Sequence, residues 1–153
     1  MSGREKKRVL FVCIGNACRS QMAEGFARRY GSDVLIPASA GLAPATRVAP
    51  DTIRAMREKN INLSEHFPKT LRQLARVKFD AVVNMSGVPL REDLKAPVEE
   101  WEVADPVAMD YEKHCQVRDE IEQRVMKLLL NLRQEQPQPR PRFRGQGSGR
   151  LPV

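Results

Sequence analysis

The sequence predicts an α/β fold with a four-stranded parallel sheet in a three-layer α/β/α arrangement. Short apolar runs rich in β-forming residues alternate with longer segments in which apolar residues recur at helical spacing. Strands that alternate with helices form parallel βαβ units with right-handed crossovers. The chain has 153 residues, of which 41% are hydrophobic and 29% charged, so it is long enough for one domain with its own core.

Each expected element has a local signal. Val9–Val12 is a short apolar run, typical of a strand buried on both faces. Pro37 indicates that the second strand lies at an edge, because proline cannot donate a ladder hydrogen bond. Ser20 is the expected cap of the first helix. In chain order we expect a strand at 9–12, a helix ending near 30, a strand at 34–38, helices at 50–59 and 70–78, strands at 79–85 and 100–103, and a helix at 111–132.

The loop between the first strand and the first helix carries the chemistry. Cys13 follows the strand, and the loop ends at a helix N-terminus, where unpaired N–H groups and the helix dipole attract an anion and favour a thiolate. Gly15 permits a positive φ and a close approach to a ligand. Arg19 supplies a planar fork of donors that matches two phosphate oxygens. A nucleophilic sulfur facing such a cradle is equipped to accept a phosphoryl group.

Three further polar residues follow expected strands as Cys13 does: Ser39, Ser86 and Asp105. Ligands of parallel sheets bind beyond the carboxyl ends of the strands, so we expect these side chains at one edge of the sheet. The proline after Asp105 biases the aspartate toward an extended backbone. Asp105 is the best candidate to protonate the leaving oxygen.

Composition argues against several classes of function. No apolar run reaches membrane-spanning length and no signal peptide is visible. Three cysteines, one of them expected to be a nucleophile, favour a reducing cytoplasm over a disulfide framework. The two histidines, His66 and His114, have no ligand cluster around them and are expected at surface or helix positions. We therefore predict no metal site and no cofactor.

The formal charge of +7 is concentrated at the two ends of the chain. Residues 4–8 contain four basic side chains and one acidic side chain, which gives a net charge of +3. Residues 135–150 give the same net charge, so the residues between them carry +1. Basic tails are most often simply solvated, so nucleic-acid binding is not expected. The catalytic domain is expected at 8–133. Residues 134–153, rich in Gln, Pro, Arg and Gly, are expected to form a disordered tail.

One loop also carries a family resemblance. The loop after the first strand reads Cys13-Ile14-Gly15-Asn16-Ala17-Cys18-Arg19-Ser20. It resembles the signature loop of the low-molecular-weight protein tyrosine phosphatase superfamily. That superfamily includes the thioredoxin-coupled arsenate reductases. The resemblance extends to Ser39–Gly41 and Trp101–Pro106 and covers most of residues 8–132.

The resemblance implies the phosphatase-like fold and a role for each matching residue. Cys13 would be the nucleophile and Asp105 the general acid. Phosphate would be bound by Ile14, Gly15, Asn16, Ala17, Cys18 and Arg19. Asn16 and Ser20 would shape the loop, and Ser39 would support it through Asn16. Cys18 would form a reversible disulfide with Cys13.

The sequence departs from both branches of the superfamily. The arsenate reductases carry two further cysteines after the third strand, but residues 84–93 contain none, and Ser86 stands where the first would be. A hydroxyl cannot take part in thiol–disulfide exchange. The phosphatases usually have aromatic pocket walls where this chain has Ala45, Val107 and Ala108, and Tyr111 is the nearest aromatic residue. Gln21 stands where the phosphatases more often carry proline, which is closer to the reductases.

We therefore expect a phosphomonoesterase of the protein tyrosine phosphatase type, which acts on a phosphate monoester or phosphoprotein through a phosphocysteine. The first alternative is an arsenate reductase that uses Cys18 or a small thiol such as glutathione or mycothiol, with thioredoxin-coupled turnover expected to fail. The second alternative is a non-catalytic phosphate-binding module in which Cys13 is inert. Arsenite production separates the first two readings.

Overall fold

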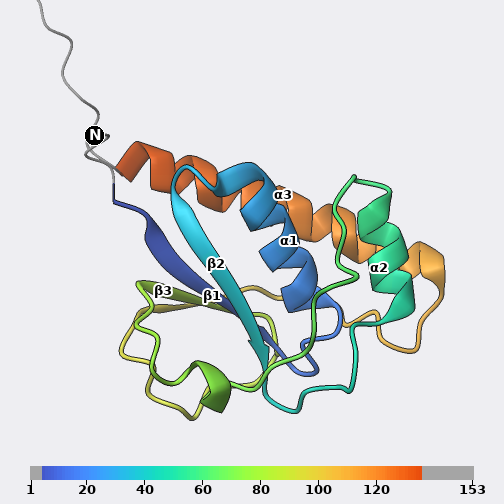
Figure 1. Cartoon of the computed structure of the whole chain (residues 1–153), viewed down its shortest axis with the longest axis horizontal. Helices are drawn as coiled ribbons and strands as arrows, with labels where there is room; N and C mark the ends of the chain where they lie inside the picture. The colour runs from blue at the N-terminus through green and yellow to red at the C-terminus, as the bar shows by residue number, and fades with distance from the viewer. Residues whose placement is uncertain (1–4, 136–153) are drawn as a thin grey trace, which may run out of the picture.

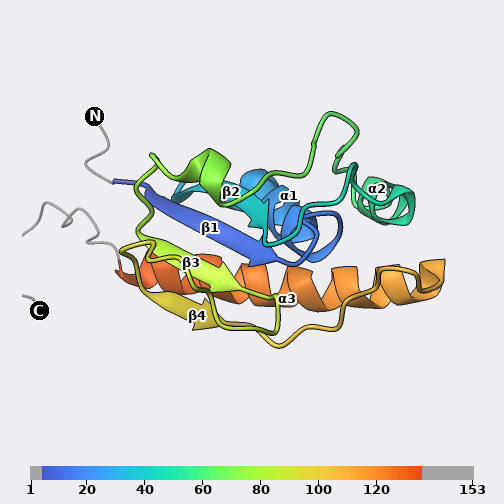
Figure 2. The same ribbon diagram turned by 90° about the horizontal axis from the view of Figure 1, so that it is seen from below.

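The computed structural model describes residues 5–135, and its four strands form one parallel sheet (Figures 1 and 2). The strands are β1 (Lys7–Cys13), β2 (Leu35–Gly41), β3 (Ala81–Asn84) and β4 (Val98–Glu100). Their order is β2-β1-β3-β4, and all three pairings are parallel. These pairings confirm the predicted fold class and the edge position of the strand that contains Pro37.

The helical layer covers one face of the sheet (Figure 1). Its members are α1 (Arg19–Gly31), α2 (Pro50–Arg57) and α3 (Tyr111–Glu135). Alternate residues of β1, Val9 and Phe11, enter this core together with Phe26 of α1 and Ile121 of α3. No helix within residues 5–135 is long and apolar enough to cross a membrane.

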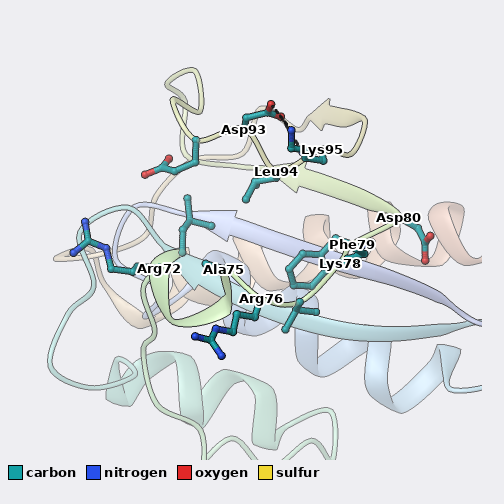
Figure 3. A pocket seen from close by; sticks show the side chains of 12 residues that line it. Arg72, Ala75, Arg76, Lys78, Phe79, Asp80, Asp93, Leu94 and Lys95 are labelled. Atoms are coloured by element: carbon teal, nitrogen blue, oxygen red, sulfur yellow. Dashed lines mark hydrogen bonds and ion pairs between the residues drawn. The ribbon is translucent and has the colours of Figure 1, made fainter.

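The opposite face is covered by a short 3₁₀ helix, η1 (Arg72–Leu74), and by connecting segments. Leu10 and Val12 of β1 are buried there with Leu71 and Phe79. A hollow of about 850 Å³ lies between residues 71–80 and residues 92–95, and both charged and apolar side chains line it (Figure 3). None of the residues that line it belongs to the loop after β1.

Two element predictions were wrong in extent because tertiary pairing overrides the local pattern. The helix expected at 70–78 is reduced to η1, since Leu71 and Phe79 are the only buried residues between 70 and 80. The strand expected at 100–103 is β4, which ends at Glu100 because its partner β3 ends opposite it at Asn84. Trp101 and Val103 are still buried, in the core under the helices.

Two boundaries also differ from the prediction. Strand β2 continues through Gly41 because it stays in register with β1 as far as the pair Cys13 and Gly41. Helix α3 continues through Glu135, so residues 134 and 135, which we assigned to a disordered tail, are helical. The rest of that predicted tail lies outside the described residues.

Candidate active site

Cys13 is the last residue of β1 and is 2% exposed. Its Sγ lies 2.9 Å from Ser20 Oγ and accepts the Ser20 N–H at 3.4 Å. Ser20 is therefore not the helix cap that we predicted: α1 begins at Arg19, and Cys18 occupies the N-cap position without a side-chain cap bond. The Ser20 side chain instead holds the sulfur at the N-terminus of α1.

Asn16 braces the loop from inside. Its φ is 50°, so the positive φ that we predicted for Gly15 occurs at Asn16, a residue type that tolerates this region. Its Nδ2 donates to Ser20 Oγ at 2.7 Å, while its Oδ1 accepts from the Lys69 backbone N–H at 2.8 Å and from Gln21 Nε2 at 3.1 Å. These bonds satisfy the buried amide and fix the loop against the connection after α2.

Gln21 is a bracing residue whose role the sequence analysis did not find. It is fully buried, and its Nε2 also lies 3.2 Å from the carbonyl oxygens of Asn16 and Phe67. Its Oε1 lies 2.9 Å from His66 Nδ1. Burial lowers the pKa of His66, which is half-buried in a loop rather than on the surface or in a helix. A chain of hydrogen bonds thus leads from His66 through Gln21 and Asn16 toward the sulfur.

Ser39 does not support the loop in the way that the resemblance implied. It is fully buried in β2, but its hydroxyl donates to Glu24 Oε1 at 2.5 Å rather than to Asn16. The close approach between β2 and the loop occurs at Gly41 instead. A Cβ added at Gly41 would lie 2.7 Å from the Ile14 carbonyl oxygen and 2.8 Å from the Asn16 nitrogen, both of them backbone atoms that define the loop.

Gly41→Ala is expected to lower phosphate affinity and turnover by at least about 10-fold, because displacing the loop by a fraction of an ångström misaligns its donors. Phosphate binding measured by calorimetry and turnover measured at saturating substrate check this. Gly25→Ala is the matched control, since its Cβ would meet only side-chain atoms, the nearest at 3.1 Å. Equal phosphate affinity in the wild type and Gly41→Ala would show that the contact does not shape the loop.

Arg19 is held by backbone carbonyls from two other segments. It is 5% exposed, and its Nη1 donates to the Met85 carbonyl at 2.5 Å and to the Val103 carbonyl at 3.0 Å. Its Nη2 lies 3.3 Å from Asp105 Oδ2. The buried Nε has no hydrogen-bond partner among the described residues. This nitrogen is a donor that a bound anion can use.

Asp105 stands at the mouth of the same site. Its side chain is 37% exposed, and its Oδ1 accepts the Val107 N–H at 3.1 Å, which fixes the start of the loop after residue 104. Asp105 and the loop enclose a cavity of about 160 Å³. The cavity is lined by Cys13, Ile14, Gly15, Ala17, Cys18, Arg19, Ala45, Asp105 and Val107. The structure thus brings the predicted nucleophile, arginine and acid together.

The family model described as low molecular weight phosphotyrosine protein phosphatase matches residues 8–138. The chain belongs to this family. The glutaredoxin arsenate reductase of Synechocystis sp. is 32% identical over 130 residues, which cover 82% of this chain and 98% of that protein. A solved structure described as an arsenate reductase in the phosphate binding state has a TM-score of 0.76 and 33% identity, and the match covers 82% of this chain and 98% of that one.

A further solved structure, the YwlE arginine phosphatase from Geobacillus stearothermophilus, has a TM-score of 0.74 and 25% identity. The match covers 84% of this chain and 94% of that one. The family relatives therefore include proteins named as reductases and as a phosphatase. The protein is an enzyme of the phosphatase and arsenate reductase superfamily, and the reductase names favour our first alternative over the tyrosine phosphatase reading.

Within residues 5–135, no aromatic side chain lines the cavity of this family member. Tyr111, the nearest aromatic residue in the sequence, hydrogen-bonds Glu58 and lies beneath the Arg54 guanidinium, 3.7 Å from ring centroid to Cζ. The walls are instead aliphatic, from Ala45 and Val107. The cavity therefore offers space and donors for a small tetrahedral oxyanion but no ring surface against which a phenyl group stacks.

The three cysteines are free and occupy different environments. Cys18 lines the same cavity as Cys13, and burial raises its pKa to about 11. Cys115 is half-buried on α3 beside Tyr111. Ser86, at the position where the reductases carry a cysteine, is buried and donates to Asn84 Oδ1 at 2.7 Å. It holds the turn after β3.

Proposed function

We propose that the protein reduces arsenate to arsenite, with Cys13 as the nucleophile and thiols as the source of electrons. The observation that carries the proposal is the small aliphatic cavity in which Cys13, Arg19 and the loop amides converge. It accommodates a tetrahedral oxyanion and offers no surface for an aromatic substituent. The arsenate reductases among the relatives, which match almost over their whole length, support the same reading.

The loop binds the anion before any chemistry occurs. The loop that lines the cavity ends at the N-terminus of α1, where unpaired backbone N–H groups favour an anion, and the Nε of Arg19 adds a charged donor without a partner among the described residues. Asp105 stands 3.3 Å from the guanidinium and lines the same cavity, with a side chain that is 37% exposed. Because the Arg19 guanidinium is fixed by two carbonyls, its fork is already oriented when the anion arrives.

Arsenate reduction then needs two steps. In the first, the Cys13 thiolate attacks arsenic, a sulfur–arsenic bond forms, and one oxygen leaves as water with a proton supplied by Asp105. In the second, another thiolate attacks the Cys13 sulfur, and a disulfide forms as the sulfur–arsenic bond breaks. The electron pair of that bond goes to arsenic, which leaves as arsenite. Arsenic gains two electrons and each sulfur loses one.

Two thiols are candidates to attack the Cys13 sulfur. One is Cys18, which lines the same cavity, and the other is a small thiol that enters from solvent. Residues 84–97 contain no cysteine, so the protein has no relay after β3 that passes a disulfide to thioredoxin. We therefore propose that a small thiol such as glutathione returns the protein to its reduced form. This chemistry suits the reducing cytoplasm that we propose as its location.

Arsenite release with different reductants tests the proposal. We expect sustained release with glutathione, glutaredoxin and glutathione reductase, and at least about 10-fold less with thioredoxin and its reductase. Release should disappear in Cys13→Ser and persist in Cys115→Ser, which changes a cysteine outside the cavity. Failure of every thiol system to support arsenite release would refute the proposed function.

The second candidate is hydrolysis of phosphate monoesters. It is favoured by Asp105, whose partly exposed carboxylate beside Arg19 stands where a leaving oxygen needs a proton. Cys13 would attack phosphorus, Arg19 and the loop amides would hold the equatorial oxygens, and Asp105 would protonate the leaving group and then activate water. One assay measures hydrolysis of para-nitrophenyl phosphate, and a second measures arsenite formed from arsenate. Turnover of at least about one phosphate per protein each second in the first assay, with no arsenite in the second, would favour the phosphatase over the reductase.

A further inference from the structure

A buried polar cluster that the proposed function does not use lies beside Cys18. Thr52 of α2 is fully buried, and its Oγ1 lies 3.2 Å from Nδ1 of His114 on α3. The Thr52 side chain also lies close enough to the Cys18 thiol to lower its pKa. His114 is 3% exposed. Three side chains from three elements thus form one chain of polar groups that starts at the cavity wall.

The far end of this chain is a base. Imidazole accepts a proton at Nδ1 when Nε2 carries the hydrogen, and a hydroxyl can accept one proton while it donates another. Cys18 is the end that meets the cavity, which it shares with Cys13. The order thiol, hydroxyl, imidazole is therefore a path along which a proton can leave Cys18 without passing through solvent.

Cys18 needs such a path if it is to react. Burial raises the pKa of the Cys18 thiol to about 11, so the thiol is protonated at neutral pH. The thiolate, not the thiol, attacks sulfur. A hydroxyl that donates to the sulfur lowers the pKa of Cys18 and opposes the effect of burial.

We propose that Thr52 and His114 form a proton relay that deprotonates Cys18 when it attacks the sulfur of Cys13. Thr52 contacts the reacting thiol, and His114 is the positioning residue behind it that takes the proton. The proposal rests on the proposed function only in that Cys13 is the reactive sulfur of the site.

Peroxide supplies the simplest version of this reaction. The Cys13 thiolate attacks a peroxide oxygen and becomes a sulfenic acid, and hydroxide is released. The Cys18 proton then passes to Thr52 as the Thr52 proton passes to His114. The Cys18 sulfur attacks the Cys13 sulfur, the sulfur–sulfur bond forms and the sulfur–oxygen bond breaks. Hydroxide leaves and takes up a proton to give water. In arsenate reduction the leaving group is arsenite instead.

Variants of the two relay residues test the proposal. Thr52→Val keeps the shape of the side chain without the hydroxyl, and Thr52→Ser keeps the hydroxyl. His114→Asn keeps a polar atom near the Nδ1 position but has no base. Each reduced full-length protein is treated with hydrogen peroxide and quenched with iodoacetamide at intervals. Peptide mass spectrometry then measures the Cys13–Cys18 disulfide and the sulfinic acid of Cys13.

We expect the disulfide to form at least ~10-fold more slowly in Thr52→Val and His114→Asn, with Cys13 diverted to the sulfinic acid. Thr52→Ser should form it at the wild-type rate. Thermal unfolding of each variant separates lost packing from lost proton transfer, because a merely structural role changes the melting temperature without changing this partition. Thr52→Ser and His114→Asn keep the test valid if Thr52→Val does not fold.

Equal disulfide rates in the wild type, Thr52→Val and His114→Asn would overturn the proposal, as would a wild-type disulfide that joins Cys13 to Cys115. The peroxide experiment uses no arsenate. A negative result in it would therefore refute the relay without refuting arsenate reduction. A slow Thr52→Val combined with no arsenite release by the wild type would support the relay and refute only the reductase.

Discussion

Cys13→Ser is expected to reduce arsenite release and phosphate ester hydrolysis by at least ~10⁴-fold. Both reactions start with attack by the Cys13 sulfur, which is fixed by Ser20 at the N-terminus of α1. A serine hydroxyl at this position stays protonated and has no base among its hydrogen-bond partners. A hydroxyl also cannot enter the disulfide that releases arsenite.

The serine variant should keep the fold and the anion site, because it changes one buried atom and leaves the loop amides in place. Calorimetry with phosphate measures the site, and the two activity assays measure the chemistry. Cys115→Ser is the matched control, since it makes the same change on α3 outside the cavity. Turnover by Cys13→Ser at even a tenth of the wild-type rate would rule out a covalent cysteine mechanism.

Arg19→Lys is expected to lower kcat/KM by about 10²–10³-fold and to weaken phosphate binding. Arg19 contacts two carbonyls and the Asp105 carboxylate through a planar fork, and its unpartnered Nε is the donor proposed for the anion. A single ammonium cannot contact all of these groups. The buried carbonyls of Met85 and Val103 would then lose their donor, which also costs stability.

Steady-state kinetics with both substrates and phosphate titrations check the Arg19 prediction. Arg28→Lys is the control on the same helix, because Arg28 pairs with Glu24 at 2.5 Å and does not line the cavity. A loss confined to the rate of chemistry, with unchanged phosphate affinity, would mean that Arg19 does not hold the anion.

The fold and the centre of the site are predictable because their signals are local. An apolar run before Cys13, a turn that contains Gly15 and a helix that begins at Arg19 follow one another within the chain. The parallel sheet then brings Asp105 to the same edge without any further information. For these residues the sequence order itself determines proximity.

The supports of the site are not predictable in this way. Gln21 braces the loop through His66, and Thr52 contacts His114, so the partners are 45 and 62 residues apart. Such bonds leave no periodic signal, because each depends on how separate elements pack. The positive φ lies at Asn16 rather than at the neighbouring glycine for the same reason, since the bonds from Lys69 and Gln21 to its side chain stabilise that conformation.

The names of the relatives favour an arsenate reductase over a tyrosine phosphatase, and the thiols of the site are compatible with that chemistry. The segment after β3 has no cysteine. This absence would argue against a reductase only if arsenate reduction required a disulfide to be passed to a cysteine in that segment. The cavity instead places Cys18 beside Cys13 and leaves the mouth accessible to a small thiol. Together with the names of the relatives, this arrangement supports a reductase whose thiol chemistry stays within the loop.

The most direct test of arsenate reduction at Cys13 counts two products in one sample. The reduced protein is mixed with arsenate and limiting glutathione and quenched with acid, after which arsenite and the disulfides of Cys13 are measured. We predict that arsenite appears in a one-to-one ratio with disulfides that contain Cys13. Arsenite no higher than in a protein-free sample, with Cys13 still reduced while the same preparation hydrolyses para-nitrophenyl phosphate, would contradict it.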